Sequence, residues 1–238
     1  MGTCWQYTVK LEARRVAEDR HSSLAASATE ITPIPFQIAK NFIERYEWLG
    51  TLGAAQRFFG LVAEDELIGV CCFMRTTSQS YFRNVLGPEL DVPIYQLCRG
   101  ASSPHAPVWA GSRLTSGALR LLRETTGAEL VTAYADPRAG EIGVVYQAAN
   151  ALYLGMTDSR GPGEYVIEGR KLHPRTVHRI YGSARDEVLK QIDPNYERIQ
   201  RSSKHRYAFV LNRGSSRRRI LERLAPLVRC APKRSLAD

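Results

Sequence analysis

The feature that most constrains this sequence is an apolar run at positions 67–74, Leu-Ile-Gly-Val-Cys-Cys-Phe-Met. A strand that is apolar at every position, instead of at alternate positions, is typical of a strand buried on both faces of its sheet. Residues 58–62 predict a second strand, and the polar segment 63–66 predicts a turn between the two. Both faces of such a sheet need cover, so the run favours an α/β fold.

Helical and strand patterns alternate along the rest of the chain. Two helices are predicted from apolar residues at helical spacing, with Phe36, Ala39, Ile43 and Tyr46 in the first and Leu114, Ala118, Leu121 and Leu122 in the second. Ser112 is the predicted N-cap of the second helix. Further elements are predicted as strands at 94–99, 129–135, 165–172 and 207–211, and as a helix at 144–153 closed by Gly155. The order predicts a mixed sheet with a central β-α-β-α unit and flanking helices.

The same patterning divides the chain into three parts. Residues 1–35 are weakly patterned, residues 36–211 form the main domain, and residues 212–238 form a basic tail. In the tail, Ile220, Leu221 and Leu224 predict a short amphipathic helix that Pro226 ends.

Composition indicates a globular, cytoplasmic protein without a membrane segment. Hydrophobic residues make up 44% of the chain and charged residues 24%, and no apolar run approaches the roughly 20 residues that cross a bilayer. The N-terminus carries no pattern of a secretory signal. The five cysteines are odd in number and lack metal-binding spacing, which indicates buried free thiols in a reducing compartment.

Positive charge is concentrated in the C-terminal third. The net charge is +9, yet residues 170–238 hold 18 Lys and Arg against 6 Asp and Glu, whereas residues 1–169 hold 15 against 18. A basic block attracts polyanions, most often nucleic acid. A solvated basic face without a specific partner is the alternative.

The segment Gly111-Ser112-Arg113 is a candidate cofactor site. It lies where a loop enters a helix, and a helix start presents unpaired amide groups and the positive end of the helix dipole. These features suit the pyrophosphate of a cofactor such as coenzyme A. A simple helix cap is the alternative.

Two further segments carry groups that can move protons. Asp136 follows a predicted strand, and the carboxyl ends of strands in open α/β sheets face the ligand crevice, so Asp136 is a candidate general base or positioning group. In the predicted helix, Tyr146, Asn150 and Tyr153 share one face that is typical of a site lining. A phenol there can act as a general acid, and Asn150 and Tyr153 are candidate cofactor-binding residues. The alternatives are a turn-capping aspartate and tyrosines that pack against the sheet.

Several short motifs taken together resemble the phage Mom family of DNA-modification proteins, a divergent branch of the GNAT acyltransferases. The motifs are Leu97-Cys98-Arg99-Gly100-Ala101, Ser112-Arg113-Leu114, Tyr134-Ala135-Asp136-Pro137, residues 143–150 and Lys204-His205-Arg206-Tyr207. Ala148, Leu152, Tyr153 and Gly155 also resemble the closing motif of GNAT enzymes. The resemblance covers roughly residues 36–211 and implies a GNAT-like catalytic domain.

The resemblance also implies an activity. Mom proteins convert adenine in DNA to a carbamoylmethyl form that protects phage DNA from restriction enzymes. The essential positions of the family match Arg99, Ser112, Asp136 and Tyr146. An acyl donor, acetyl-CoA or another carrier, would lie near Ser112, while Asp136 and Tyr146 would handle protons or bind a metal at the exocyclic amine.

Two departures qualify this implication. Residues 45–50, Arg-Tyr-Glu-Trp-Leu-Gly, stand where family members often carry a His-Tyr pair after the first helix; Tyr46 persists but no histidine is present, so a metal site has no clear ligand motif. Tyr46 and Glu47 are a possible additional site, in which Glu47 could join Asp136 as a carboxylate pair. Gly111 is the only glycine between Ala101 and Ser116, so the usual phosphate loop is incomplete and aminoacyl-tRNA remains an alternative donor.

DNA is the expected partner of the basic residues. Phosphate contacts are predicted for Lys204, His205, Arg206, Arg217, Arg218 and Arg219, and base stacking for Tyr207. The alternative functions are acyl transfer to a small amine, a protein or a charged tRNA, and non-catalytic nucleic-acid binding.

Overall fold

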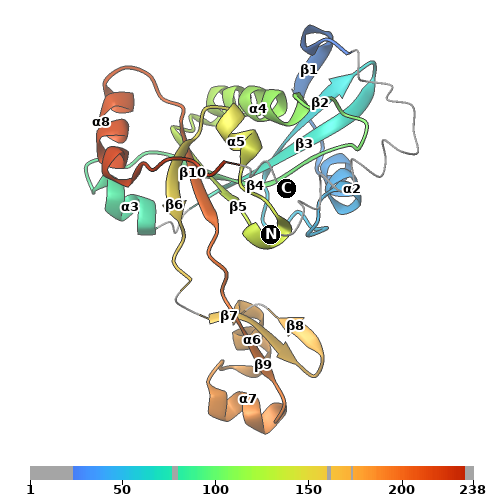
Figure 1. Ribbon diagram of the computed structural model, residues 1–238, viewed down its shortest axis with the longest axis vertical. Helices are drawn as coiled ribbons and strands as arrows, with labels where there is room; N and C mark the ends of the chain where they lie inside the picture. The colour runs from blue at the N-terminus through green and yellow to red at the C-terminus, as the bar shows by residue number, and fades with distance from the viewer. Residues whose placement is uncertain (1–23, 77–79, 160–161, 173, 234–238) are drawn as a thin grey trace. The chain divides into compact units, whose positions relative to one another are not determined.

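The apolar run forms β3 (Glu66–Arg75), whose central six residues are all buried. The computed structural model describes residues 24–76, 80–159, 162–172 and 174–233. β3 pairs antiparallel with β2 (Arg57–Ala63) through the predicted turn, and with β4 (Ile94–Ser102) on its other side. The strand buried on both faces is therefore confirmed, because β3 has a neighbour at each edge and helices over each face (Figure 1).

β3 and β4 belong to a mixed sheet of seven strands in the order β1-β2-β3-β4-β5-β10-β6. Its remaining strands are β1 (Thr29–Pro33), β5 (Leu130–Ala135), β6 (Leu152–Met156) and β10 (His205–Val210). β4 and β5 run parallel, while β10 returns antiparallel to β5. The mixed α/β sheet with flanking helices that the sequence predicts is confirmed.

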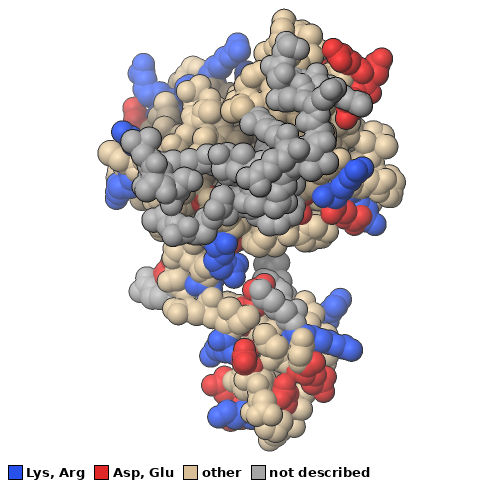
Figure 2. Space-filling model, turned by 45° about the vertical axis from the view of Figure 1, so that its right-hand side comes forward, with Lys and Arg blue, Asp and Glu red and all other residues tan. Residues whose placement is uncertain are grey.

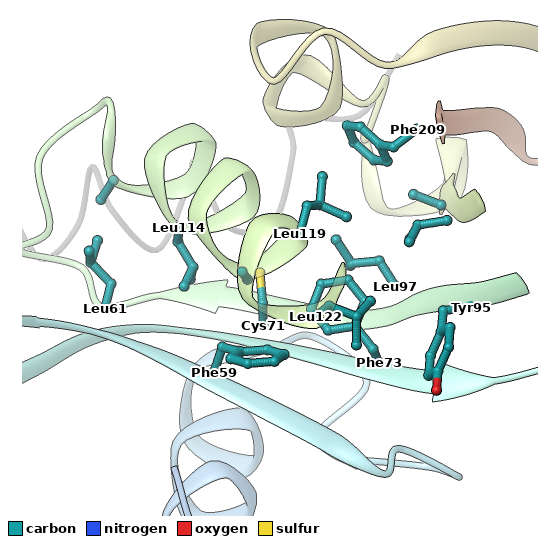
Figure 3. Close-up of a cluster of buried hydrophobic side chains, with 14 of the residues drawn as sticks. Phe59, Leu61, Cys71, Phe73, Tyr95, Leu97, Leu114, Leu119, Leu122 and Phe209 are labelled. Atoms are coloured by element: carbon teal, nitrogen blue, oxygen red, sulfur yellow. The ribbon is translucent and has the colours of Figure 1, made fainter. Parts of the chain in front are cut away.

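One face of the sheet is covered by α4 (Ala110–Thr126) and α5 (Val144–Ala148). Leu114, Leu119 and Leu122 of α4 point onto aromatic and aliphatic side chains of β2, β3 and β4, and Phe209 of β10 lies beside them (Figure 3). The predicted apolar face of this helix is thus the face that builds the larger core. The helix ends at Gly127, which has the left-handed φ of 68° that a C-terminal glycine adopts readily.

The opposite face carries two separate clusters. α2 (Phe36–Tyr46) packs Ala39, Phe42 and Ile43 against Val70 and Cys72. Further along the sheet, α3 (Ser80–Leu86) and α8 (Gly214–Leu224) form a second cluster with β4, β5, β6 and β10. The amphipathic tail helix is confirmed, and its Ile220 and Leu224 are fully buried. Three 3₁₀ turns complete this part of the chain: Ala26–Ala28, Pro137–Ala139 and Ala225–Leu227.

Residues 156–204 form a second compact unit. It contains a three-stranded sheet, β8-β7-β9, and two helices. The elements are β7 (Pro162–Ile167), β8 (Arg170–Leu172), α6 (Pro174–Tyr181), α7 (Asp186–Ile192) and β9 (Glu197–Gln200). Tyr165, Ile167, Val177 and Leu189 make its core. The single strand predicted at 165–172 is a hairpin, because Glu168 and Gly169 adopt left-handed φ values of 51° and 71° and turn the chain.

These units differ from the three parts expected from the sequence. The first unit comprises residues 1–155 and 205–238, so it joins segments of all three expected parts. β1 belongs to the large sheet and α8 packs on it, whereas residues 156–204 separate from the expected domain at 36–211. Sequence patterns predict individual helices and strands, but they do not show which helices and strands share a hydrophobic core. None of the helices in the described ranges has the length and apolar character of a membrane span.

Candidate active site

β4 and β5 share a ladder for only part of their length. Their parallel register runs from Ile94 opposite Leu130 to Leu97 opposite Ala133. β4 continues to Ser102 and β5 to Ala135, so the two carboxyl ends extend beyond the register. Both ends lie at the same edge of the sheet, the edge where α/β proteins place ligands. Arg99 and Asp136 come just after this point on the two strands, as the sequence predicted.

Arg99 fixes the loop that follows α2. Its Nε donates to the carbonyl oxygen of Thr51 at 2.5 Å, and Nη1 donates to the carbonyl oxygen of Cys98 at the same distance. Nε also lies 4.0 Å from Oε2 of Glu47, whose side chain is 7% exposed. The guanidinium therefore orders the loop from Glu47 to Thr51 and places a positive charge beside a buried carboxylate.

Asp136 is buried, with an exposed fraction of 3%. Its Oδ1 accepts a hydrogen bond from the backbone N–H of Arg138 at 3.0 Å, so it caps the turn Pro137–Ala139. The Arg138 guanidinium donates to both carboxylate oxygens, at 3.4 and 3.2 Å. Asp136 therefore plays the capping role that the sequence left as an alternative. A buried carboxylate held from one side by its own turn keeps a defined orientation.

Glu141 links this turn to α5, and sequence reasoning did not single it out. Its backbone N–H donates to the carbonyl oxygen of Asp136 at 3.2 Å. Its Oε2 accepts from the backbone N–H of Asp136 at 3.4 Å. The only sequence signal is its place in the Gly140–Gly143 turn between two functional motifs.

Tyr146 lies on α5 with its ring against the aromatic residues of β10. The ring centroid is 5.5 Å from that of Tyr207 and 6.2 Å from that of Phe209. Burial, and then the negative charge of Glu141, raise the pKa of the Tyr146 phenol well above its ordinary value of 10.0. The phenol is therefore protonated at neutral pH, which suits a proton donor and not a phenolate base.

The expected helix at 144–153 is wrong beyond residue 148. Asn150 has a φ of 63°, a left-handed conformation that asparagine tolerates, and the chain then enters β6. Tyr153 consequently lies on a strand, where its hydroxyl is 3.0 Å from Nδ1 of His205. Asn150 and Tyr153 do not share a helix face with Tyr146, and the cofactor role predicted from that face loses its geometric basis.

Tyr207 holds the start of α5 in place. Its buried hydroxyl donates to the carbonyl oxygen of Ile142 at 2.5 Å and accepts from Nε2 of Gln147 at 3.0 Å. Gly143 lies so close that a Cβ there would be 2.4 Å from Cε2 of the Tyr207 ring. Since Tyr207 is 0% exposed, the base-stacking role expected for it is wrong, and the residue instead positions the turn that precedes Tyr146.

The start of α4 differs from the prediction. The helix begins at Ala110 with Trp109 as N-cap, so Ser112 lies inside the first turn, where its Oγ donates to the carbonyl oxygen of Trp109 at 3.0 Å. Ala110 and Gly111 can continue a helix toward the N-terminus, which is why an N-cap three residues earlier is allowed. The predicted cap at Ser112 is wrong, although Ser112 remains at the helix start.

The other two predicted cofactor residues here have structural contacts. A Cβ on Gly111 would lie 3.1 Å from Cγ2 of Val145, so the small residue lets α5 pack on α4. Arg113 donates to Oγ1 and the carbonyl oxygen of Thr29, at 2.6 and 3.0 Å, and ties α4 to β1. These contacts direct neither Gly111 nor Arg113 toward a pyrophosphate.

The cysteines near the site are free thiols. Cys71 and Cys72 are buried, Cys98 is half-buried and Cys230 is exposed. The expectation of buried thiols therefore holds for the first three and not for Cys230. Cys4 lies outside the described residues. Burial raises the pKa of Cys71 to about 12 and that of Cys98 to about 11. Both thiols are therefore protonated and poor nucleophiles at neutral pH.

Comparison with known proteins decides the family. Residues 28–226 match the Mom protein family. The chain belongs to this family. The methylcarbamoylase Mom of Escherichia phage Mu is 30% identical over 108 residues, which cover 45% of this chain and 44% of that protein. The match thus spans less than half the length of this relative.

Solved structures similar to this Mom-family chain are acetyltransferases. The ribosomal-protein-S5-alanine acetyltransferase from Vibrio fischeri is 10% identical with a TM-score of 0.44, covering 78% of this chain and 94% of that one. The putative acetyltransferase yncA from Salmonella typhimurium, solved with acetyl-CoA, is 11% identical with a TM-score of 0.45, covering 79% and 96%. Similarity at this level says nothing of what the Mom-family chain binds.

The residues of this Mom-family chain at the missing His-Tyr pair, Arg45 to Glu47, have structural contacts. Tyr46 packs on Phe42 with ring centroids 4.7 Å apart and lies under the guanidinium of Arg45. Glu47 lies beside Arg99, whereas Asp136 is held by Arg138, so each carboxylate has its own arginine. Among the described residues no group of three or more His, Cys, Asp or Glu is placed to hold a metal ion.

The basic residues that the Mom resemblance assigned to nucleic acid are not equivalent. Arg206 is half-buried, with its guanidinium 3.8 Å from the centroid of the Tyr81 ring, and burial lowers the pKa of His205 below its ordinary 6.5. The carbonyl oxygen of Lys204 accepts a hydrogen bond from the backbone N–H of Thr157, and the backbone N–H of Lys204 donates to Oγ1 of Thr157. Three side chains on α8 are exposed and suit phosphate contacts: Arg217, Arg218 and Arg219.

Proposed function

We propose that this chain is a Mom-type transferase that adds a carbamoylmethyl group to the exocyclic amine of adenine in DNA. The observation that carries the proposal is that Arg99 and Asp136 lie where β4 and β5 pass beyond their shared register, with Glu141 linking the Asp136 turn to the α5 segment that carries Tyr146, in a member of the Mom family. The basic C-terminal third supports a polyanionic acceptor. An adenine in duplex DNA must leave the base stack to reach such a site.

In this proposal each residue has a distinct task. Asp136, fixed by its cap and by Arg138, accepts a hydrogen bond from the exocyclic amine and takes its proton as transfer proceeds. Tyr146 is protonated before the transfer and gives its proton to the departing group as the bond between that group and the carbamoylmethyl carbon breaks. Arg99 holds the neighbouring loop and the Glu47 carboxylate, so it is a positioning residue.

For the donor of the carbamoylmethyl group we propose only a chemical class. Ser112 and the first-turn amides of α4 suit an anionic donor. Gly111 and Arg113, however, are engaged with Val145 and Thr29, which does not fit a side-chain grip on coenzyme A. We therefore derive no step through coenzyme A or through a metal.

The test is mass spectrometry of nucleosides from cells that produce the protein. Modified adenosine should appear with the wild-type chain and fall by about 100-fold or more with Asp136→Asn or Tyr146→Phe, the range for loss of an acid or base. Asp91→Asn removes an exposed carboxylate paired with Arg83, and Tyr196→Phe removes an exposed hydroxyl bonded to Asp186; both should retain activity. Unmodified adenosine with the wild-type chain would refute the proposal and favour acyl transfer to another amine.

A further inference from the structure

The unit at residues 156–204 is an insertion between two neighbouring strands of the large sheet. β6 leads into it and β10 leaves it, and β6 and β10 lie side by side in that sheet. Its core of Tyr165, Ile167, Val177 and Leu189 is its own, and all four are 0% exposed. The insertion is thus a folded addition to a sheet that already holds the candidate site.

Charge is segregated along this unit. Residues 169–185 contain five Lys and Arg and two His, with no Asp or Glu. Residues 186–197 contain four Asp and Glu against one Lys. Figure 2 shows both signs on the part of this unit that faces the viewer. The unit therefore contains a basic segment, β8 and α6, followed by an acidic segment, α7 and the residues to Glu197, whereas residues 198–204 hold three Lys and Arg and no Asp or Glu.

α6 turns His178 and Arg179 away from the core of its unit. Val177 is fully buried and Tyr181 packs partly against the same core, one turn further on. His178 and Arg179, in the last turn of α6, are exposed, as is Arg170 of the preceding β8. Ile180, beside Arg179, is 54% exposed. The outer face thus combines cations with one apolar side chain.

Two acidic groups of this unit, Asp186 and Asp193, are engaged elsewhere in its fold. Asp186 accepts a hydrogen bond from the Tyr196 hydroxyl at 2.7 Å and lies 3.7 Å from Nη1 of Arg198. Asp193 accepts from the backbone N–H groups of Glu168 and Asn195, at 2.8 and 2.9 Å. These contacts of the two aspartates are with turns and with β9, and none of them involves a cation of α6.

We propose that the outer face of α6, with the adjoining β8, is a docking surface for the phosphate backbone of duplex DNA. The partner rests on the proposed function, in which DNA is the acceptor. Charge complementarity favours a polyanion, and Arg is suited to phosphate oxygens. A lipid surface would require a broad apolar face, whereas the exposed residues described on α6 include one large apolar side chain, Ile180. Docking here holds the duplex without reading its sequence.

The test measures binding of the full chain to a random-sequence 20-base-pair duplex by fluorescence anisotropy, over a range of salt concentrations. Each lost phosphate contact lowers the slope of log affinity against log salt by about 0.9, which at 0.15 M salt corresponds to about a five-fold loss of affinity. Arg179→Gln should show this change, and the double variant Arg170→Gln/Arg179→Gln, which removes one exposed cation from β8 and one from α6, should lose about 30-fold. The matched control is Lys190→Gln, which removes an exposed cation from α7 and should alter neither the affinity nor the slope.

The outcomes separate this inference from the proposed function when DNA modification is measured on the same variants. A wild-type chain that modifies DNA, with a double variant of unchanged affinity and slope, overturns the docking surface alone. Affinity that depends on α6 without any DNA modification supports the docking surface and refutes the proposed function. Equal losses for Arg179→Gln and Lys190→Gln, or binding to phosphatidylserine vesicles in preference to DNA, also overturn the docking surface.

Discussion

Gly143 is the residue whose replacement tests the positioning of Tyr146 most directly. Its φ is 75°, and an added Cβ would lie 2.4, 2.7 and 2.9 Å from Cε2, Cζ and the hydroxyl oxygen of Tyr207. Gly143→Ala therefore combines two effects. The left-handed backbone costs an alanine about 1 kcal/mol. Overpacking against a fully buried ring adds about 1–3 kcal/mol.

Gly127→Ala is the matched control. Gly127 has a similar φ of 68°, but the structure places no described atom within 4 Å of its added Cβ. Gly127→Ala should thus destabilise by about 1 kcal/mol, and Gly143→Ala by about 2–4 kcal/mol. The Tyr207 hydroxyl also forms hydrogen bonds with Ile142 and Gln147, which lie on either side of Tyr146 in the sequence. Gly143→Ala should therefore lower DNA modification as well.

The assay is urea unfolding followed by tryptophan fluorescence. The three tryptophans, at positions 5, 48 and 109, lie outside residues 156–204, so the signal reports on the unit that holds the site. In a Tyr207→Ala background the clash is absent, and Gly143→Ala should then cost no more than Gly127→Ala. Equal costs for Gly143→Ala and Gly127→Ala in the wild-type background would show that the Tyr207 ring does not lie against Gly143, and would refute the reasoning.

Two further predictions concern Arg99 and His205. Arg99→Lys should destabilise the chain by about 1–3 kcal/mol, because an ammonium cannot reproduce the separate Nε and Nη1 bonds to Thr51 and Cys98; a urea midpoint unchanged from wild type would contradict this. Burial lowers the pKa of His205 below 6.5, so the unfolded chain binds more protons than the folded one and the free energy of unfolding falls as pH drops below 6.5. His205→Asn should reduce this pH dependence. The control His178→Asn, at an exposed position, should not reduce it. Identical plots of unfolding free energy against pH for the two variants would show that His205 does not cause the dependence.

The sequence alone predicted the elements that depend on local patterns. β3, the helices at 36–46 and 110–126 and the strand before Asp136 follow from apolar periodicity and from Pro137. The same reasoning failed at 144–153, where a helical pattern hides a turn at Asn150, because left-handed backbone at a non-glycine residue leaves little trace in periodicity. It also misplaced the start of α4, since Ala110 and Gly111 are compatible with either state.

The placement of Arg99 on β4, Asp136 after β5 and Tyr146 on α5 was predictable, because their motifs are short and local. Their surroundings were not. The contacts of Arg99 with Thr51, of Tyr207 with Ile142 and of Arg113 with Thr29 join residues 48, 65 and 84 positions apart. No spacing rule encodes such pairs, because they form only when the sheet brings distant segments together.

The sequence by itself determined that this protein has a doubly covered mixed sheet, a basic C-terminal third and a motif set of the Mom family. Only the tertiary structure decided that Tyr207 is buried under Gly143 instead of facing a base, and that residues 156–204 form a unit of their own. The physical reason is that composition and periodicity report which side chains prefer burial, whereas the partner that buries each one depends on contacts between segments far apart in the chain.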